Sequence, residues 1–240
     1  RRRELIEMKI DLRKKYFMVL DVETTNNQIG VKNAPNDGLV YDLGFGIYDK
    51  QGNEYLAESL VIKEIFYDKE LMNTAYYRRK LPKYYEEIKQ GKRKVVTLLQ
   101  ARKMIKQAVE QFKVEEVYAY NANFDYTTLN NTTRLVTSSY VRWFLPYGTK
   151  VCDIWHIACQ VLGTQKTFQW ENVRNENGNL ITNAERMFSY MLQEEFSEEH
   201  TGLEDTRIEA QILVRCFKSH KKINKNINRS CWRIPQKVVA

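Results

Sequence analysis

The stretch YFMVLDVETTN, residues 16–26, places two acidic residues at the end of an apolar run. Its first five residues are apolar or aromatic without alternation, which is typical of a strand buried on both faces. Asp21 and Glu23 then follow with one residue between them. Because strand side chains alternate between two faces, these carboxylates point to the same side, roughly 6.6 Å apart. Such a pair repels itself unless a cation lies beside it, and a solvated strand end is the competing interpretation.

Two more acidic residues stand at similar positions later in the chain. Asp125 follows a predicted strand at residues 115–121, near a helix start, where capping is a sufficient explanation because the helix dipole favours a carboxylate. Asp205 lies on the apolar face of a helix predicted over residues 202–220, five residues after His200. An aspartate on a buried face is costly without a partner. Carboxylates that converge in this way are the ligands that Mg²⁺ prefers.

Three segments that contain these residues resemble, in order, the motifs of the DnaQ-like DEDDh 3′–5′ exonucleases. They are Asp21-Val22-Glu23, Asn121 to Asp125 (N-x-x-F-D), and His200 to Asp205 (H-x-x-x-x-D). The resemblance covers residues 16 to about 217. It implies an α/β, ribonuclease H-like fold with a five-stranded mixed sheet flanked by helices. The segment at 175–192 resembles phage-encoded members of the family.

The resemblance also implies a role for each of these residues. Four carboxylates are implied to hold two Mg²⁺ ions, for which Mn²⁺ would substitute: Asp21, Glu23, Asp125 and Asp205. Asp21 would bridge both ions, and His200 would be the general base that deprotonates the attacking water. Three residues are implied to hold the 3′-terminal nucleotide: Thr24, Thr25 and Phe124. For Phe124, packing in the core is an equally good interpretation.

The function that this resemblance implies is metal-dependent 3′–5′ exonuclease activity. The expected substrate is single-stranded DNA, and the expected products are nucleoside 5′-monophosphates. HTGLED at 200–205 also resembles RNA-directed members, so trimming of RNA 3′ ends is one alternative. A nucleic-acid-binding module on the same fold, associated with a polymerase or another protein partner, is the other.

The pattern of elements predicts one α/β domain with short extensions. We expect a basic N-terminal extension at 1–15, the exonuclease domain at 16–217, and a basic tail at 218–240. The expected strands lie at 16–23, on either side of a turn at Gln51-Gly52-Asn53, at 115–121 and near 150–153. The expected helices lie at 97–112, from about Asp125, near 153–163, at 183–196 and at 202–220.

Charge and composition narrow the class of protein further. The formal net charge is +8. No acidic residue follows Glu209, so all of the net charge lies in the last part of the chain, as a solvated end or a nucleic-acid contact. Hydrophobic residues make up 43% of the chain. The apolar runs are too short to cross a membrane. Four cysteines give no disulfide framework, which favours a reducing, cytoplasmic setting, or the host cytoplasm for a phage protein.

Two further patterns each have two interpretations. Residues 76–94 interleave four tyrosines with lysines and arginines. This favours binding of a single strand by stacking and charge, against a solvated helix and loop. Cys152, His156 and Cys159 have the spacing of one helical face, but a fourth zinc ligand is not evident, so simple burial is favoured. Asp153 either caps the helix that follows it or supports the site, and capping is favoured.

Overall fold

The computed structural model of the protein describes residues 10–25, 38–138, 141–197 and 200–237. Its centre is a mixed sheet with the strand order β4-β3-β2-β1-β5-β6. The strands are β1 (Tyr16–Thr24), β2 (Val40–Asp49), β3 (Glu54–Ile62), β4 (Lys94–Val96), β5 (Glu116–Ala119) and β6 (Lys150–Asp153). The first three form an antiparallel meander, and β4, β5 and β6 pair parallel to β3, β1 and β5.

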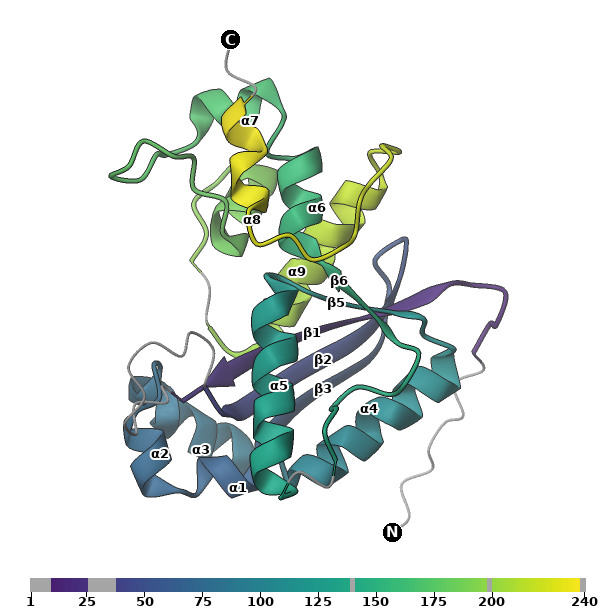
Figure 1. The fold of residues 1–240 in the computed structure, drawn as a ribbon, viewed down its shortest axis with the longest axis vertical. Coiled ribbons are helices and arrows are strands. Elements are labelled where there is room, and N and C mark those ends of the chain that lie inside the picture. Colours follow the sequence, from purple (N-terminus) through teal and green to yellow (C-terminus); the bar gives the residue numbers. More distant parts are fainter. Residues whose placement is uncertain (1–9, 26–37, 139–140, 198–199, 238–240) are drawn as a thin grey trace.

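Helices cover both faces of this sheet (Figure 1). They are α1 (Lys63–Phe66), α2 (Lys69–Asn73), α3 (Leu81–Lys89), α4 (Leu98–Phe112), α5 (Ala122–Val136), α6 (Ile154–Val161), α7 (Lys166–Glu171), α8 (Ala184–Leu192) and α9 (Gly202–Phe217). Short 3-10 turns are η1 (Arg78–Lys80), η2 (Cys231–Arg233) and η3 (Pro235–Lys237). In Figure 1, α4 and α5 lie in front of the strands and α9 lies behind them.

The alternation of β1 divides the core into two layers. Met18, Leu20 and Val22 pack into the cluster that includes α4 and α5, whereas Phe17 and Val19 pack into the cluster that includes α6 and α9. Odd-numbered side chains of β1 therefore face α9. This parity determines which way the acidic end of the strand points.

The structure corrects two of the predicted elements. The sheet has six strands rather than five, because three residues at 94–96 pair with the edge of β3. A run this short carries too little pattern to separate it from a loop. Helix α5 begins at Ala122 instead of near Asp125, because Asn121 adopts a left-handed conformation with φ of 62°, which asparagine tolerates better than most residues.

Two helix starts are confirmed as predicted. Thr97 caps α4, because its hydroxyl accepts a hydrogen bond from the Gln100 N–H at 3.2 Å and the Gln100 side chain accepts one from the Thr97 N–H at 2.8 Å. Asp153 caps α6, because its carboxylate accepts from the Trp155 N–H at 3.0 Å. The same carboxylate also accepts from the Asn121 N–H at 3.2 Å, so it ties the start of α5 to the start of α6.

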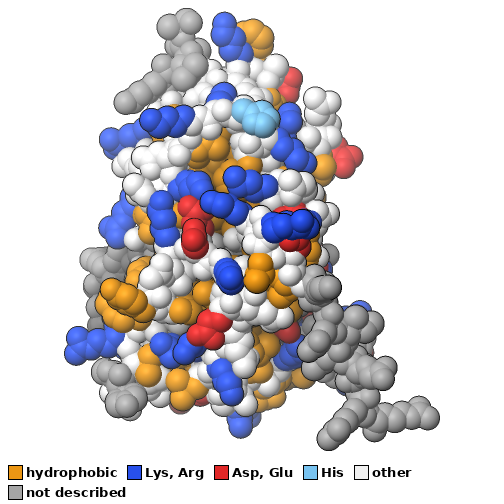
Figure 2. Space-filling view, turned by 90° about the vertical axis from the view of Figure 1, so that its right-hand side faces the viewer, with side chains coloured by type: hydrophobic (Ala, Val, Ile, Leu, Met, Phe, Trp, Pro, Cys, Tyr) orange, Lys and Arg blue, Asp and Glu red, His pale blue; other side chains and the backbone are white. Residues whose placement is uncertain are grey.

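The segment after α9 packs against α6. The carbonyl of Lys225 accepts a hydrogen bond from the Asp153 N–H at 2.9 Å, and Cys231 is fully buried. Lys225 also forms an ion pair with Glu116 at 2.7 Å. Figure 2 shows Lys and Arg side chains gathered in the upper half of one face, with acidic side chains among them. Among the described helices, none has the length and apolar character of a membrane span.

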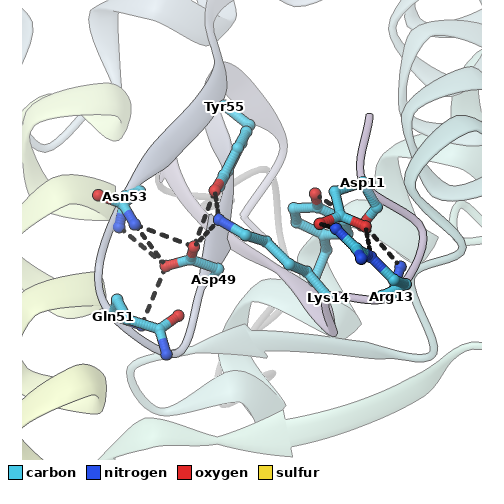
Figure 3. Close-up of polar contacts among 8 residues, drawn as sticks. Asp11, Arg13, Lys14, Asp49, Gln51, Asn53 and Tyr55 are labelled. Atoms are coloured by element: carbon cyan, nitrogen blue, oxygen red, sulfur yellow. Dashed lines mark hydrogen bonds and ion pairs between the residues drawn. The ribbon is translucent and has the colours of Figure 1, made fainter. Parts of the chain in front are cut away.

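The turn between β2 and β3 lies at the end of the sheet where β1 begins, and Asp49 anchors it (Figure 3). Its buried carboxylate accepts hydrogen bonds from the Gln51 N–H at 2.9 Å and the Tyr55 hydroxyl at 2.8 Å, and it pairs with Lys14 at 3.2 Å. Burial raises the pKa of Asp49, but hydrogen bonds from Asn53, Tyr55 and Lys14 together outweigh it and hold the pKa well below its usual range. This network joins the residues before β1 to the meander.

Candidate functional site

The acidic end of β1 faces helix α9. Asp21 and Glu23 share the side of the strand that carries Phe17 and Val19, and their register partners on β2 are Gly44 and Asp42. Asp21 keeps partial access to solvent, while Glu23 is 8% exposed. The two carboxylates therefore point toward α9, as the alternation of β1 predicts.

Two glycines bring the start of α9 against the sheet at this point. A Cβ atom on Gly44 would lie 2.1 Å from the Gly202 carbonyl carbon, and a Cβ atom on Gly202 would lie 2.6 Å from the Gly44 nitrogen. Only residues without side chains allow such an approach. Gly44 lies opposite Asp21, so the contact places the first turn of α9, which carries Asp205, next to Asp21.

A buried charge network holds the same helix end. Asp42 is fully buried, and its carboxylate accepts hydrogen bonds from the Gly202 N–H at 3.1 Å and the Tyr84 hydroxyl at 2.6 Å. Arg93 forms an ion pair with Asp42, and its guanidinium lies 4.1 Å from the centre of the Tyr84 ring. An acceptor at a helix N-terminus satisfies an N–H that the helix itself leaves unpaired.

Replacing Gly202 with alanine should therefore destabilise the protein. Alanine favours a helix more than glycine by roughly 1 kcal/mol, so any loss must come from the close contacts with Gly44 and the Asp21 carbonyl oxygen. We expect the free energy of unfolding in urea to fall by about 1–3 kcal/mol, the usual cost of an overpacked contact. Gln211→Ala, on the exposed side of α9, is the control. An unchanged or higher stability for Gly202→Ala would show that the helix end does not depend on this contact.

Three carboxylates meet where β1 and α9 touch. Asp21, Glu23 and Asp205 each offer an oxygen, and these oxygens lie within 4.8 Å of one another. No other group of three potential metal ligands among the described residues has its ligand atoms this close together. Asp205 lies in the first turn of α9 and is 7% exposed. The structure thus joins residues that are more than 180 positions apart in the sequence.

Asp125 approaches the group from α5. It is 2% exposed, and its Oδ2 atom has no hydrogen-bond partner among the described residues. Burial raises the pKa of Asp125 well above its usual range, and the backbone N–H of Val22, between Asp21 and Glu23, is a smaller influence that lowers it. An unsatisfied buried oxygen is costly unless a ligand completes it.

Burial and mutual repulsion raise the pKa values across this cluster. Burial is the main cause of the raised pKa of Asp21, followed by the negative charges of Glu209 and Asp125. Burial also raises the pKa of Glu23 to about 9, with the charge of Asp42 as the next cause. Carboxylates that resist ionisation in the free protein would ionise readily if a cation lay between them.

His200 lies just before α9, in a left-handed backbone conformation. Its φ is 49°, and Thr201 separates it from the first residue of the helix. The imidazole stacks on the Tyr77 ring, with ring centres 4.6 Å apart and planes 11° apart. Burial lowers the pKa of His200, and the nearby positive charge of Lys80 lowers it further. The ring is therefore neutral at ordinary pH and able to accept a proton.

The three residues expected at the 3′-terminal nucleotide lie in different environments. Thr24 ends β1, at an irregularity in the pairing with β2. Thr25 is 1% exposed, and its hydroxyl accepts a hydrogen bond from the Leu39 N–H at 3.2 Å. This buried hydrogen bond gives Thr25 a structural role. Phe124 is partly buried against the core cluster beside α5. Residues 26–37, which follow Thr25, lie outside the described residues.

Two buried acidic residues of this region are absent from the sequence-based set. Glu209 is 3% exposed, and its carboxylate accepts a hydrogen bond from the Tyr120 N–H at 3.2 Å. It lies four residues after Asp205, on the same side of α9, and that spacing was a usable signal. Asp42 lies in an apolar run, where a lone aspartate signals a buried partner. Its partner, Arg93, is 51 residues away, so the sequence could not identify the pair.

The spacing of Cys152, His156 and Cys159 does not correspond to one helical face. Cys152 lies in β6, and the other two lie in α6. His156 Nδ1 forms a 2.7 Å hydrogen bond with the Asn226 carbonyl, and Nε2 lies 3.3 Å from the Asn228 amide. The two cysteines are therefore buried core residues. His156 anchors the C-terminal segment through its contacts with Asn226 and Asn228.

The protein resembles known proteins in its structure, without a match to them in sequence searches. No protein-family model matches the sequence, and no curated protein matches it. The nuclease domain of 3′hExo, a DEDDh family member bound to rAMP, superposes with a TM-score of 0.60 at 11% identity, covering 89% of this chain and 96% of that chain. A 3′-exonuclease that recognises the 3′ end of a histone mRNA stem-loop has a TM-score of 0.57 at 11% identity, covering 89% and 86%.

A DNA-bound exonuclease has the same fold within a longer chain. E. coli Exonuclease I, in complex with a 5cy-dT13 oligonucleotide, superposes with a TM-score of 0.53 at 11% identity, covering 86% of this chain but 41% of that one. The chain thus spans less than half of that enzyme. These likenesses establish the fold, which is the ribonuclease H-like fold of DEDDh exonucleases. The predicted α/β fold class is confirmed.

Proposed function

We propose that the protein is a metal-dependent 3′–5′ exonuclease. The observation that carries this proposal is the convergence of Asp21, Glu23 and Asp205 within 4.8 Å on this fold, beside the buried carboxyl group of Asp125. Burial and the neighbouring carboxylates raise the pKa of Asp21, and a cation bound between these groups would offset both effects.

The donor set fits divalent cations that prefer oxygen. Mg²⁺ binds carboxylates together with substrate phosphates, and Mn²⁺ accepts the same ligands. Asp21, Glu23 and Asp205 would hold one ion, and Asp21 with Asp125 a second. The orphaned Oδ2 atom of Asp125 supports this assignment. Bound ions would neutralise the scissile phosphate and lower the pKa of a bound water.

A residue of the chain accounts for removal of the proton from the attacking water. His200 has a lowered pKa, so its imidazole is neutral and accepts a proton from the attacking water. The water oxygen forms a bond to phosphorus, and the bond from phosphorus to the O3′ atom of the preceding nucleotide breaks. O3′ takes a proton from solvent. The products are a nucleoside 5′-monophosphate and a strand shortened by one nucleotide with a free 3′ hydroxyl.

The proposed substrate is single-stranded nucleic acid, with DNA as the first candidate. E. coli Exonuclease I has the same fold and is seen with single-stranded DNA oligonucleotides. RNA is the second candidate, because the structures with the higher TM-scores contain rAMP or recognise a histone mRNA stem-loop. We also infer that residues 16–217 form the catalytic unit, and that the four free cysteines reflect a reducing, cytoplasmic setting.

Digestion of matched strands tests this proposal. DNA and RNA of one sequence, labelled at the 5′ end, are incubated with the protein in Mg²⁺, in Mn²⁺ and in excess chelator. We expect stepwise shortening of at least one strand with either metal and none with chelator. Intact strands under every condition, with a protein that unfolds cooperatively, would favour a binding module instead, and shortening in chelator would refute metal dependence.

Thermal stability should depend on pH and metal together. The pKa of Glu23 is raised to about 9 in the folded protein, so the folded state retains protons that the unfolded state releases above pH ~4. Stability of the metal-free protein should therefore fall as pH rises from about 4 to 9. At about 100 times its Kd, Mn²⁺ should raise Tm by roughly 5–10 °C.

The shift in Tm should be larger at pH 8 than at pH 6, because fewer protons then compete with the metal. Differential scanning calorimetry in the presence and absence of Mn²⁺ measures both effects. An equal Tm shift in Asp21→Asn would place the metal elsewhere on the chain.

A further inference from the structure

A short segment after α2 runs along the end of β1. Ala75 forms an isolated antiparallel bridge with Thr25, two residues after Glu23. The chain then turns through η1, where the Arg78 N–H donates to the Ala75 carbonyl at 3.2 Å and the Lys80 N–H donates to the Tyr77 carbonyl at 2.9 Å. Tyr76 and Arg78 are exposed, whereas Tyr77 and Lys80 are half-buried. Tyr77 and Lys80 are therefore the residues of this turn that pack inward, against the rest of the protein.

Both inward residues contact His200. The Tyr77 ring lies parallel to the imidazole, with ring centres 4.6 Å apart. Lys80 Nζ donates to the His200 carbonyl at 3.4 Å and lies 4.7 Å from the centre of the Tyr77 ring. One residue thus contacts the histidine side chain, and another contacts its backbone, from the same turn of η1.

The backbone links this turn to the carboxylates on two sides. Thr25, which bridges Ala75, lies two residues after Glu23. Thr201 and Gly202 join His200 to the first turn of α9, which carries Asp205. The contact between η1 and His200 therefore lies beside the carboxylate cluster.

The backbone of His200 lies in the left-handed region, with a φ of 49°, a conformation that histidine adopts more readily than most residues with a Cβ atom. The next residue, Thr201, is fully buried and precedes the glycine contact with β2. The position of the imidazole is therefore set by α9 on one side and by Tyr77 and Lys80 on the other.

We propose that Tyr77 is a positioning residue for the His200 imidazole, which it fixes by ring stacking while Lys80 anchors the His200 carbonyl. The catalytic part of this inference rests on the proposed function, because it takes His200 as the general base. The stack itself does not depend on that function. Stacking removes rotational freedom from the imidazole and fixes the directions of its nitrogens. A misplaced acid–base group lowers the rate of the chemical step far more than it lowers binding.

Mutation of Tyr77 tests the catalytic consequence. Tyr77→Ala should lower kcat by roughly 10- to 100-fold, with little change in the Kd for a strand that has a non-cleavable 3′ linkage. Tyr77→Phe keeps the ring and should retain kcat. Tyr147→Ala, a fully exposed tyrosine, is the matched control. Wild-type kcat in Tyr77→Ala, or an equal loss in Tyr77→Phe, would overturn the proposal.

The stack can be observed without any activity. The chain contains three histidines, so ¹³C-labelled histidine gives a ring spectrum simple enough to assign with His156→Gln and His220→Ala. His200 ring protons should be shifted upfield by the Tyr77 ring in the wild type and in Tyr77→Phe, and should lose that shift in Tyr77→Ala. No such shift in the folded wild type would overturn the proposal. An upfield shift combined with an active His200→Ala would instead refute the general-base role and leave the stack intact.

Discussion

Replacing Asp21 with asparagine should lower exonuclease turnover by at least about 10³-fold, the upper range for loss of one electrostatic stabiliser. Asp21 lies at the centre of the cluster, where the charges of Glu209, Asp125, Glu23 and Asp205 all act on it. Asparagine has the same shape but removes the charge that a shared cation needs. Because repulsion also disappears, the metal-free variant should be at least as stable as the wild type. Steady-state digestion and calorimetry measure the two effects.

An aspartate outside the site provides the control for this change. Asp68 caps α2 through a 3.0 Å hydrogen bond from the Leu71 N–H, and asparagine caps helices equally well. Asp68→Asn should therefore leave both rate and stability unchanged. Near-native turnover in Asp21→Asn would mean that the cluster is not the reaction centre. A large loss of stability in that variant would mean that the carboxylate has a structural partner.

Removal of the imidazole is expected to have the second largest effect. His200→Ala should lower turnover by about 10²–10⁴-fold, the range for a positioned general base. The Kd for a non-cleavable strand should change far less, because the carboxylates remain. In the wild type, the rate should fall as pH decreases through the lowered pKa of His200, since protonation removes the base. Single-turnover rates across pH measure this.

His220 is the control for His200. It is exposed, it follows α9, and it also has a positive φ, of 55°. His220→Ala should therefore leave the rate unchanged. If His200→Ala kept the wild-type rate across the whole pH range, His200 would be a structural residue and the base would have to be another group.

The sequence predicted the direction of Asp21 and Glu23 because a strand has a fixed two-residue period. The apolar run fixed β1 as a central strand, and the parity of Phe17 and Val19 then determined the side that the carboxylates occupy. Asp205 was predicted for a similar reason, because an acidic residue on the apolar face of a helix needs a partner. Short-range periodicity is sufficient for such statements.

Contacts between distant segments were beyond this reasoning. The approach of Gly44 to Gly202 depends on how β2 and α9 meet in space, and the pair formed by Asp42 and Arg93 depends on how β2 meets the loop between α3 and β4. The stack between Tyr77 and His200 joins residues 123 positions apart. The sequence singled out residues 76–94 for their composition, but only the fold shows that η1 reaches the site.

The basic residues near the C-terminus show a different limit. Their charge predicted a solvated end or a nucleic-acid contact, yet Lys225 pairs with Glu116 and Arg229 donates to the Asn123 side chain at 3.0 Å. Composition counts charges but does not reveal their partners. Arg229 contacts the first turn of α5, which also carries Asp125. The segment therefore combines an anchoring role with proximity to the site.

The most direct measurement of the central claim is anomalous scattering from crystals grown with Mn²⁺ and a nucleoside 5′-monophosphate. We predict Mn²⁺ peaks bound by Asp21, Glu23 and Asp205, and between Asp21 and Asp125, with the phosphate of the nucleotide as a further ligand. Crystals of Asp21→Asn should lose these peaks. An ordered cluster without any peak at saturating Mn²⁺, or Mn²⁺ bound only at other residues, would contradict the assignment of this site as the metal centre of an exonuclease.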